Sequence, residues 1–179
     1  MKNILYRTKT YLAGAMQYKN GEGWRNIVQS KLERMGIIVF SPYHKPFMKD
    51  IQEDDGARKH IGDLIKENNY DEVVSRMKEV RSYDLNLVDR SDFIIAYIDP
   101  KTPTFGTMEE LVTSVRMKRP TFIFVEGGKK LCPYWIFGMF PHKYIYDDVD
   151  GVLNMLEKID SGEKEIDSDR WRLLKKEYR

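Results

Sequence analysis

Short apolar runs that alternate with helical patterns constrain the fold of this chain more than any other feature of its sequence. Each run is rich in β-branched and aromatic residues and is bounded by turn signals, which is typical of buried strands. The predicted strands span residues 10–13, 37–40, 93–98, 121–125 and 144–146, and the predicted helices span residues 24–34, 73–88, 108–117 and 149–159. Strands that are separated by helices form a parallel sheet covered on both faces. We therefore expect a doubly wound α/β domain with about five strands.

The length and the charge distribution indicate one domain with two additions. A chain of 179 residues suits a single core, which we assign to residues 1–160. Residues 43–72 are charged and poorly periodic, so they are predicted to form an insertion above the sheet. Residues 161–179 are polar and then weakly amphipathic, and we expect a helical C-terminal tail there.

The composition argues against several classes of protein. A formal net charge of +2 is too small to predict binding of polymeric nucleic acid. Cys132 is the only cysteine, so an intrachain disulfide is excluded, and no neighbour is placed to activate its thiol. The three histidines do not have metal-ligand spacing, and no apolar run reaches membrane-spanning length. We expect a soluble cytoplasmic protein without a metal, a cofactor or a membrane partner.

Residues at the predicted strand ends are the first candidates for a binding site, because ligands of doubly wound sheets bind beyond the carboxyl ends of the strands. Gly14 follows the first strand, where it allows close approach of the backbone to a ligand and where the next helix offers free N–H groups. Asp99 follows the strand 93–98, and Gly106 lies in the loop before the next helix. A glycine after a strand is also a common turn residue, so Gly14 alone is a weak signal.

Thr107 and Glu110 have the spacing of a capping box, with Thr107 as the N-cap and Glu110 as the third helical residue. One interpretation is that Glu110 only caps its own helix. The other is catalytic, because a helix N-terminus keeps a carboxylate ionised, as a nucleophile must be. The sequence leaves both interpretations open.

Asp84 lies in an apolar stripe of the helix 73–88. A buried charge there costs free energy, so it is expected either to form an ion pair or to have a function. A salt bridge to Arg81 or Arg116 would explain it structurally. As a catalytic group, Asp84 would be an acid or base that faces the site.

Three segments form a recognisable pattern: the run Tyr11-Leu-Ala-Gly14, the run that begins at Asp84-Leu-Asn-Leu-Val-Asp and continues through Asp92-Phe-Ile-Ile, and Gly106-Thr-Met-Glu-Glu110. Together they resemble the nucleoside 2-deoxyribosyltransferase family. The general look of the chain, including Gly23-Trp24-Arg25 and the charged insertion, is similar to phage-borne members of that family. The match spans roughly residues 8–126. The resemblance implies a flavodoxin-like, or Rossmann-like, sheet and a covalent glycosyl-enzyme mechanism on a nucleoside or nucleotide.

The resemblance also implies roles for individual residues. Glu110 matches the nucleophile that attacks the anomeric carbon, Tyr11 matches the tyrosine that orients it, and Asp84 matches the residue that meets the nucleobase. Gly14 and the amides of Ala15 and Met16 match the segment that holds the sugar or its 5′-phosphate.

One position departs from the family pattern. Members often carry an aspartate two residues before the glycine, where this chain has Thr104, and Asp99 is the candidate substitute. Transfer of the sugar to a second base is the expected reaction. Hydrolysis, with water as the acceptor, is the alternative, and a nucleotide-binding regulatory module without turnover is the alternative from another class.

Two further expectations concern assembly and the 5′ end of the substrate. The aromatic segment 133–139, which contains Trp135, suits a homo-oligomer interface that completes the substrate site. Arg25 follows Gly23 and Trp24 at the start of the first helix, where it is predicted to bind a phosphate; the alternative is a solvated surface arginine.

Overall fold

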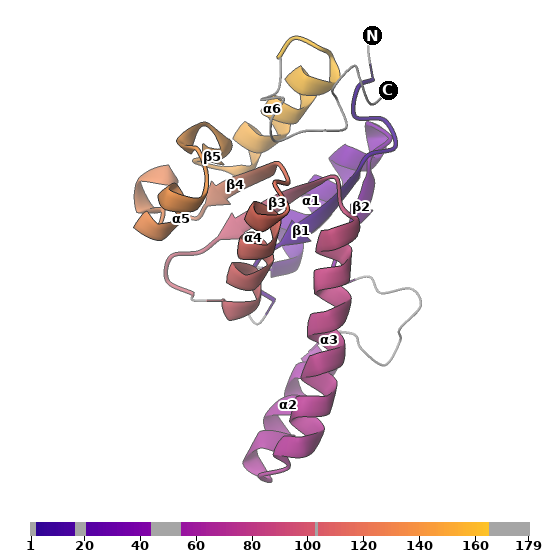
Figure 1. The fold of residues 1–179 in the computed structure, drawn as a ribbon, viewed down its shortest axis with the longest axis vertical. Helices are drawn as coiled ribbons and strands as arrows, with labels where there is room; N and C mark the ends of the chain where they lie inside the picture. Colours follow the sequence, from indigo (N-terminus) through magenta and orange to yellow (C-terminus); the bar gives the residue numbers. More distant parts are fainter. Residues whose placement is uncertain (1–2, 17–20, 44–54, 103, 165–179) are drawn as a thin grey trace.

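The computed structural model describes residues 3–16, 21–43, 55–102 and 104–164, and it shows a five-stranded, all-parallel sheet with helices on both faces (Figure 1). The strand order is β2-β1-β3-β4-β5. The strands are β1 (Lys9–Ala13), β2 (Ile38–Phe40), β3 (Phe93–Ile98), β4 (Thr121–Val125) and β5 (Ile145–Tyr146). The helices are α1 (Gly21–Arg34), α2 (Asp55–Lys66), α3 (Tyr70–Arg90), α4 (Phe105–Arg116), α5 (Tyr134–Met139) and α6 (Val149–Asp160), with short 3₁₀ turns at Lys129–Leu131 and His142–Tyr144. The predicted flavodoxin-like fold is confirmed.

The alternation of side chains along each strand divides the core into two layers. Phe93, Ile95 and Tyr97 of β3 face α1 and α6, whereas Ile94, Ala96 and Ile98 face α3 and α4. In β1 the same alternation places Leu12 on the α1/α6 face, and Tyr11 and Ala13 on the α3/α4 face. Residues that share a face of the sheet therefore meet, although they are distant in sequence.

The predicted strands at 93–98 and 121–125 match the observed bounds, but the strand predicted at 37–40 is not buried. It is the edge strand β2, with one neighbour, β1, and its Ile38 is 43% exposed.

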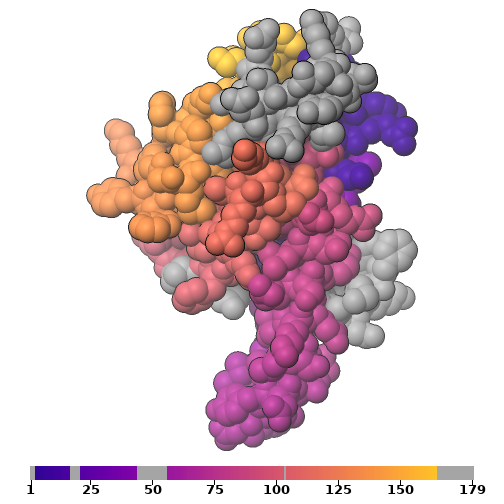
Figure 2. Space-filling model, viewed as in Figure 1, coloured from indigo at the N-terminus to yellow at the C-terminus, as the bar shows by residue number. Residues whose placement is uncertain are grey.

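The segment predicted as an insertion contains α2, and its last residues begin α3. These two helices contact each other and project away from the sheet, and the hairpin extends well beyond the body of the molecule (Figures 1 and 2). α3 begins at Tyr70 and not at residue 73, so one long helix runs from the projecting hairpin back to the sheet. Residues 44–54 of the predicted insertion and residues 165–179 of the predicted tail lie outside the described residues.

No helix in the described ranges is long and apolar enough to cross a membrane.

Candidate active site

A pocket of about 420 Å³ opens between α3 and α4, next to the end of β1. Tyr11, Asp84 and Glu110, which come from three separate elements, all line it. Gly14, Met16 and Gly106 line it as well. The structure therefore brings together six of the ten residues predicted for the site.

The Tyr11 hydroxyl donates a hydrogen bond of 2.7 Å to a carboxylate oxygen of Glu110. Both side chains are buried, with exposed fractions of 1% and 8%. Burial and the negative charges of Glu110 and Asp84 raise the pKa of Tyr11 well above its ordinary value. Tyr11 therefore stays protonated and serves as a permanent donor that fixes the orientation of the Glu110 carboxylate.

The capping interpretation of Glu110 is wrong. α4 begins at Phe105 with Thr104 as its N-cap, and the Met108 amide already donates to the Thr104 carbonyl at 3.1 Å. Thr107 is consequently a buried residue inside the first turn and not the cap. Glu110 lies beyond that turn, and its carboxylate bonds to Tyr11 of β1.

Asp84 is half-buried on α3 and shares the pocket with Glu110. The two arginines considered as structural partners do not pair with it. The Arg81 guanidinium binds Glu109 on α4, with Nε 2.8 Å from Oε2, and Arg116 is exposed at the far end of α4. Asp84 thus adds a second acidic side chain to the pocket without a salt bridge to either arginine.

The loop after β1 forms one wall of the pocket. A Cβ atom at Gly14 would lie 3.1 Å from Cζ2 of Trp24 and 3.3 Å from Cβ of Tyr97, so the close packing of this loop favours glycine. Between the two pocket-lining residues Gly14 and Met16, Ala15 is buried, and Met16 is half-buried. Arg58 of α2 donates to the Met16 carbonyl, so the projecting hairpin also contacts this loop.

Arg25 corrects both expectations made for it, since it neither contacts solvent nor lines the pocket. Its side chain is 1% exposed, and its guanidinium donates to main-chain carbonyls of the loop. The acceptors are Leu12 at 3.2 Å, Gly14 at 2.8 Å, Ala15 at 3.3 Å and Gly21. A guanidinium whose donors are directed at the backbone in this way is not presented to a substrate phosphate.

Two other predicted site residues lie elsewhere. The Asp99 carboxylate accepts hydrogen bonds from the Lys101 amide at 2.9 Å and the Thr102 hydroxyl at 2.8 Å, so it closes the turn after β3 and does not line the pocket. Trp135 is 78% exposed on α5, which lies near β4 and β5 (Figure 1).

Sequence reasoning missed the apolar part of the pocket. Met77, Val80 and Leu85 of α3 and Phe105 of α4 line it, and Phe105 is 90% exposed. Met77 and Val80 belong to the stripe that predicted a buried helix face, but Met77 is 44% exposed because that part of α3 lies beyond the sheet. The sequence did contain a signal for this apolar lining, namely an apolar stripe on a helix that extends beyond the sheet.

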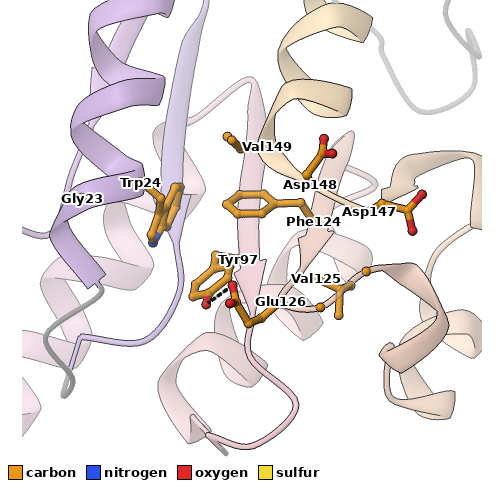
Figure 3. A pocket seen from close by; sticks show the side chains of 11 residues that line it. Gly23, Trp24, Tyr97, Phe124, Val125, Glu126, Asp147, Asp148 and Val149 are labelled. Atoms are coloured by element: carbon orange, nitrogen blue, oxygen red, sulfur yellow. Dashed lines mark hydrogen bonds between the residues drawn. The ribbon is translucent and has the colours of Figure 1, made fainter.

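A second pocket, of about 810 Å³, opens on the α1/α6 face (Figure 3). Trp24, Tyr97 and Phe124 form its aromatic wall, and Glu126 accepts a 2.8 Å hydrogen bond from the Tyr97 hydroxyl. None of the three predicted catalytic residues lines this pocket. We therefore place the candidate active site on the α3/α4 face, although the other pocket is larger.

Cys132 and the potential metal ligands are the other reactive groups of the described residues. Burial raises the pKa of the Cys132 thiol to about 11, which agrees with an unreactive cysteine. In the described ranges, no group of three or more His, Cys, Asp or Glu side chains is placed to hold a metal ion.

Comparison with known proteins relates the chain to enzymes by structure alone. No family model and no curated protein matches the sequence. A 2-deoxyribosyltransferase of Bacillus psychrosaccharolyticus superposes with a TM-score of 0.56 at 19% identity, over 82% of this chain and 91% of that enzyme. A CMP N-glycosidase of Clostridium botulinum gives a TM-score of 0.48 at 16% identity, over 84% of this chain and 98% of that enzyme. This chain thus shares its fold with a 2-deoxyribosyltransferase.

Proposed function

We propose that this protein cleaves the N-glycosidic bond of a deoxynucleoside or its 5′-monophosphate and transfers the 2-deoxyribosyl group to another base. The observation that carries the proposal is the buried Tyr11–Glu110 pair, which holds a carboxylate in a pocket that a second acid, Asp84, also lines. A buried carboxylate with a fixed orientation is the arrangement that a carboxylate nucleophile requires. The sequence resemblance and the shared fold favour the same chemistry.

In the first step, a Glu110 oxygen attacks the anomeric carbon while the bond from that carbon to the base nitrogen breaks. The bonding electrons leave with the base, and Asp84 in its acid form supplies a proton to it. The carboxylate also stabilises the positive charge that develops on the sugar ring in the transition state. The product is a glycosyl ester of Glu110 and a free base.

In the second step, a nitrogen of an incoming base attacks the same carbon and displaces Glu110. Asp84, now ionised, accepts the proton that this nitrogen loses. If water attacks instead, the reaction is hydrolysis, which releases 2-deoxyribose from a nucleoside and 2-deoxyribose 5-phosphate from a monophosphate. Both outcomes share the first step and the same residues.

The lining of the pocket suits such a substrate. The apolar side chains of Met77, Val80, Leu85 and Phe105 offer a surface for a flat base. The loop at Gly14 and Met16 offers main-chain groups for the sugar. Thr104, which stands where relatives often carry an aspartate, also lines the pocket and brings a neutral hydroxyl to it.

The test is to incubate the purified protein with a panel of deoxynucleosides and their monophosphates, with and without a second base. We expect release of free base, together with a new nucleoside when the second base is present. Base release without a new nucleoside would identify a hydrolase. Saturable binding without any base release over hours would contradict the proposal and indicate a regulatory module.

We also propose a homo-oligomer that uses the segment around α5. Leu131, Tyr134 and Trp135 are 54%, 92% and 78% exposed, and Phe137 is 40% exposed. Contiguous exposed apolar side chains of this kind are typical of interfaces. Sedimentation at micromolar concentration tests this proposal, and a strict monomer would contradict it.

A further inference from the structure

Arg25 has the largest fully buried side chain of the described residues, and this side chain is charged. Burying a guanidinium costs free energy unless its donors are satisfied. Among the described residues, Arg25 donates to the carbonyls of Leu12 in β1, of Gly14 and Ala15 in the following loop, and of Gly21 at the start of α1. Arg25 therefore binds the loop that walls the proposed active site.

These hydrogen bonds also fix the direction of the loop amides. In a trans peptide unit the carbonyl and the N–H group point in opposite directions, and no cis peptide bond is found in the described chain. When the carbonyls of Gly14 and Ala15 point at the guanidinium, the N–H groups of Ala15 and Met16 point away from it. Across the described residues, neither amide has a hydrogen-bond acceptor.

The start of α1 keeps this arrangement tight. A Cβ atom at Gly21 would lie 2.5 Å from the Ala15 carbonyl oxygen and 2.7 Å from the Tyr43 hydroxyl. The Trp24 ring stacks near the guanidinium, with Cζ of Arg25 4.6 Å from the ring centroid. Gly14 and Ala15 are thus closely packed between β1 and the start of α1.

We infer that Arg25 is a positioning residue that turns the Ala15 and Met16 amides toward the substrate, where they bind oxygens of the sugar or of a 5′-phosphate. The inference rests on the proposed function for the identity of the ligand. It replaces a direct arginine–phosphate contact with two main-chain donors that the arginine orients. Loss of Arg25 should therefore weaken the use of nucleosides and of monophosphates alike.

The first test compares Arg25→Lys and Arg25→Ala with Arg34→Ala, a control on the exposed part of the same helix. Misplacement of substrate-binding groups costs on the order of 10- to 100-fold in kcat/KM, and we expect a loss of about that size for both Arg25 variants on both substrate types. Guanidinium ion at millimolar concentration should restore part of the activity of Arg25→Ala. Arg34→Ala should resemble the wild type.

The second test does not need turnover. We expect the amide resonances of Ala15 and Met16 to shift when 2-deoxyribose 5-phosphate is added to the wild-type protein, and to shift much less in Arg25→Lys. If Arg25→Ala does not fold, Arg25→Lys carries both tests. Unchanged amide titrations in Arg25→Lys would overturn the inference, as would a loss of activity confined to monophosphates. If no base is released by any protein but the amide shifts still depend on Arg25, the proposed function fails and the positioning role stands.

Discussion

The two pockets at the carboxyl end of the sheet each contain a tyrosine bonded to a glutamate, and the pairs differ in burial. Tyr11 and Glu110 meet on the α3/α4 face at 2.7 Å, and both are buried. Tyr97 and Glu126 meet on the α1/α6 face at 2.8 Å, but Glu126 is exposed (Figure 3).

The difference between the pairs supports the proposal that Glu110, and not Glu126, is the catalytic carboxylate. An exposed carboxylate is stabilised by water and needs no further explanation. A buried carboxylate costs free energy, so its retention next to a second acid indicates a function. The proposal therefore predicts that the larger pocket is the less reactive one, and this prediction can be tested one residue at a time.

The largest effect is expected for Glu110→Gln, which preserves the shape of the side chain but removes the nucleophile. Base release should fall by roughly 10³-fold or more, because loss of a nucleophile removes the covalent step. The free energy of unfolding should be unchanged or higher, because a buried charge is removed. Initial rates and denaturant unfolding of the same preparations check both statements, and a variant with normal rates would remove Glu110 from the mechanism.

Asp84→Asn should have the next largest effect. Without a proton donor for the leaving base, base release should fall by about 10²-fold or more, the contribution of a general acid. The loss should be smallest for a substrate whose base leaves readily without protonation. Equal losses on good and poor leaving groups would place Asp84 in binding and not in proton transfer.

Tyr11→Phe should give a smaller loss. A hydrogen bond to a charged group contributes about 1.5–3 kcal/mol, so kcat/KM should fall roughly 10- to 100-fold. Tyr97→Phe is the matched control in the other pocket and should leave kcat/KM unchanged within error. If the two variants lose activity equally, the distinction between the faces is wrong.

The alkaline stability of the wild type should depend on Tyr11. Its pKa is raised in the folded state, so above pH 10 the unfolded chain loses this proton while the folded chain keeps it. The free energy of unfolding contributed by Tyr11 is therefore complete below pH 10 and falls above it by up to about 1.4 kcal/mol per pH unit. Denaturant unfolding at pH 10 and 11 should show a steeper decline for the wild type than for Tyr11→Phe. Parallel declines would mean that Tyr11 ionises normally.

The smallest effect is expected for Glu126→Gln. Because this carboxylate is exposed and lies outside the candidate site, base release should stay within about twofold of the wild type, as for most surface substitutions. A large loss in this variant, with the fold intact by circular dichroism, would move the active site to the α1/α6 face.

The sequence was sufficient to predict the sheet, because its strands are short apolar runs bounded by turn residues. The family resemblance also pointed to Tyr11, Asp84 and Glu110, which line one pocket in the structure. The sequence-based prediction misplaced the start of α4 by about one turn, since the Thr107–Glu110 spacing fits a cap as well as a helix interior.

The errors at Arg25 and Asp99 share a physical cause. Sequence position showed that both side chains lie near strand ends, but not that nearby backbone groups would take up their hydrogen-bonding capacity. Competition from local backbone groups becomes visible only when the loops are placed in three dimensions.

The most direct test of the central claim is mass spectrometry of the enzyme after incubation with a deoxynucleoside that carries fluorine at C2′ of the sugar. Fluorine at this position slows the breakdown of a glycosyl-enzyme. We predict that one sugar attaches to the protein, that the modified peptide carries the sugar on Glu110, and that Glu110→Gln remains unmodified. Base release by the wild type without any trapped sugar, or a sugar attached to another residue, would contradict a mechanism with Glu110 as the nucleophile.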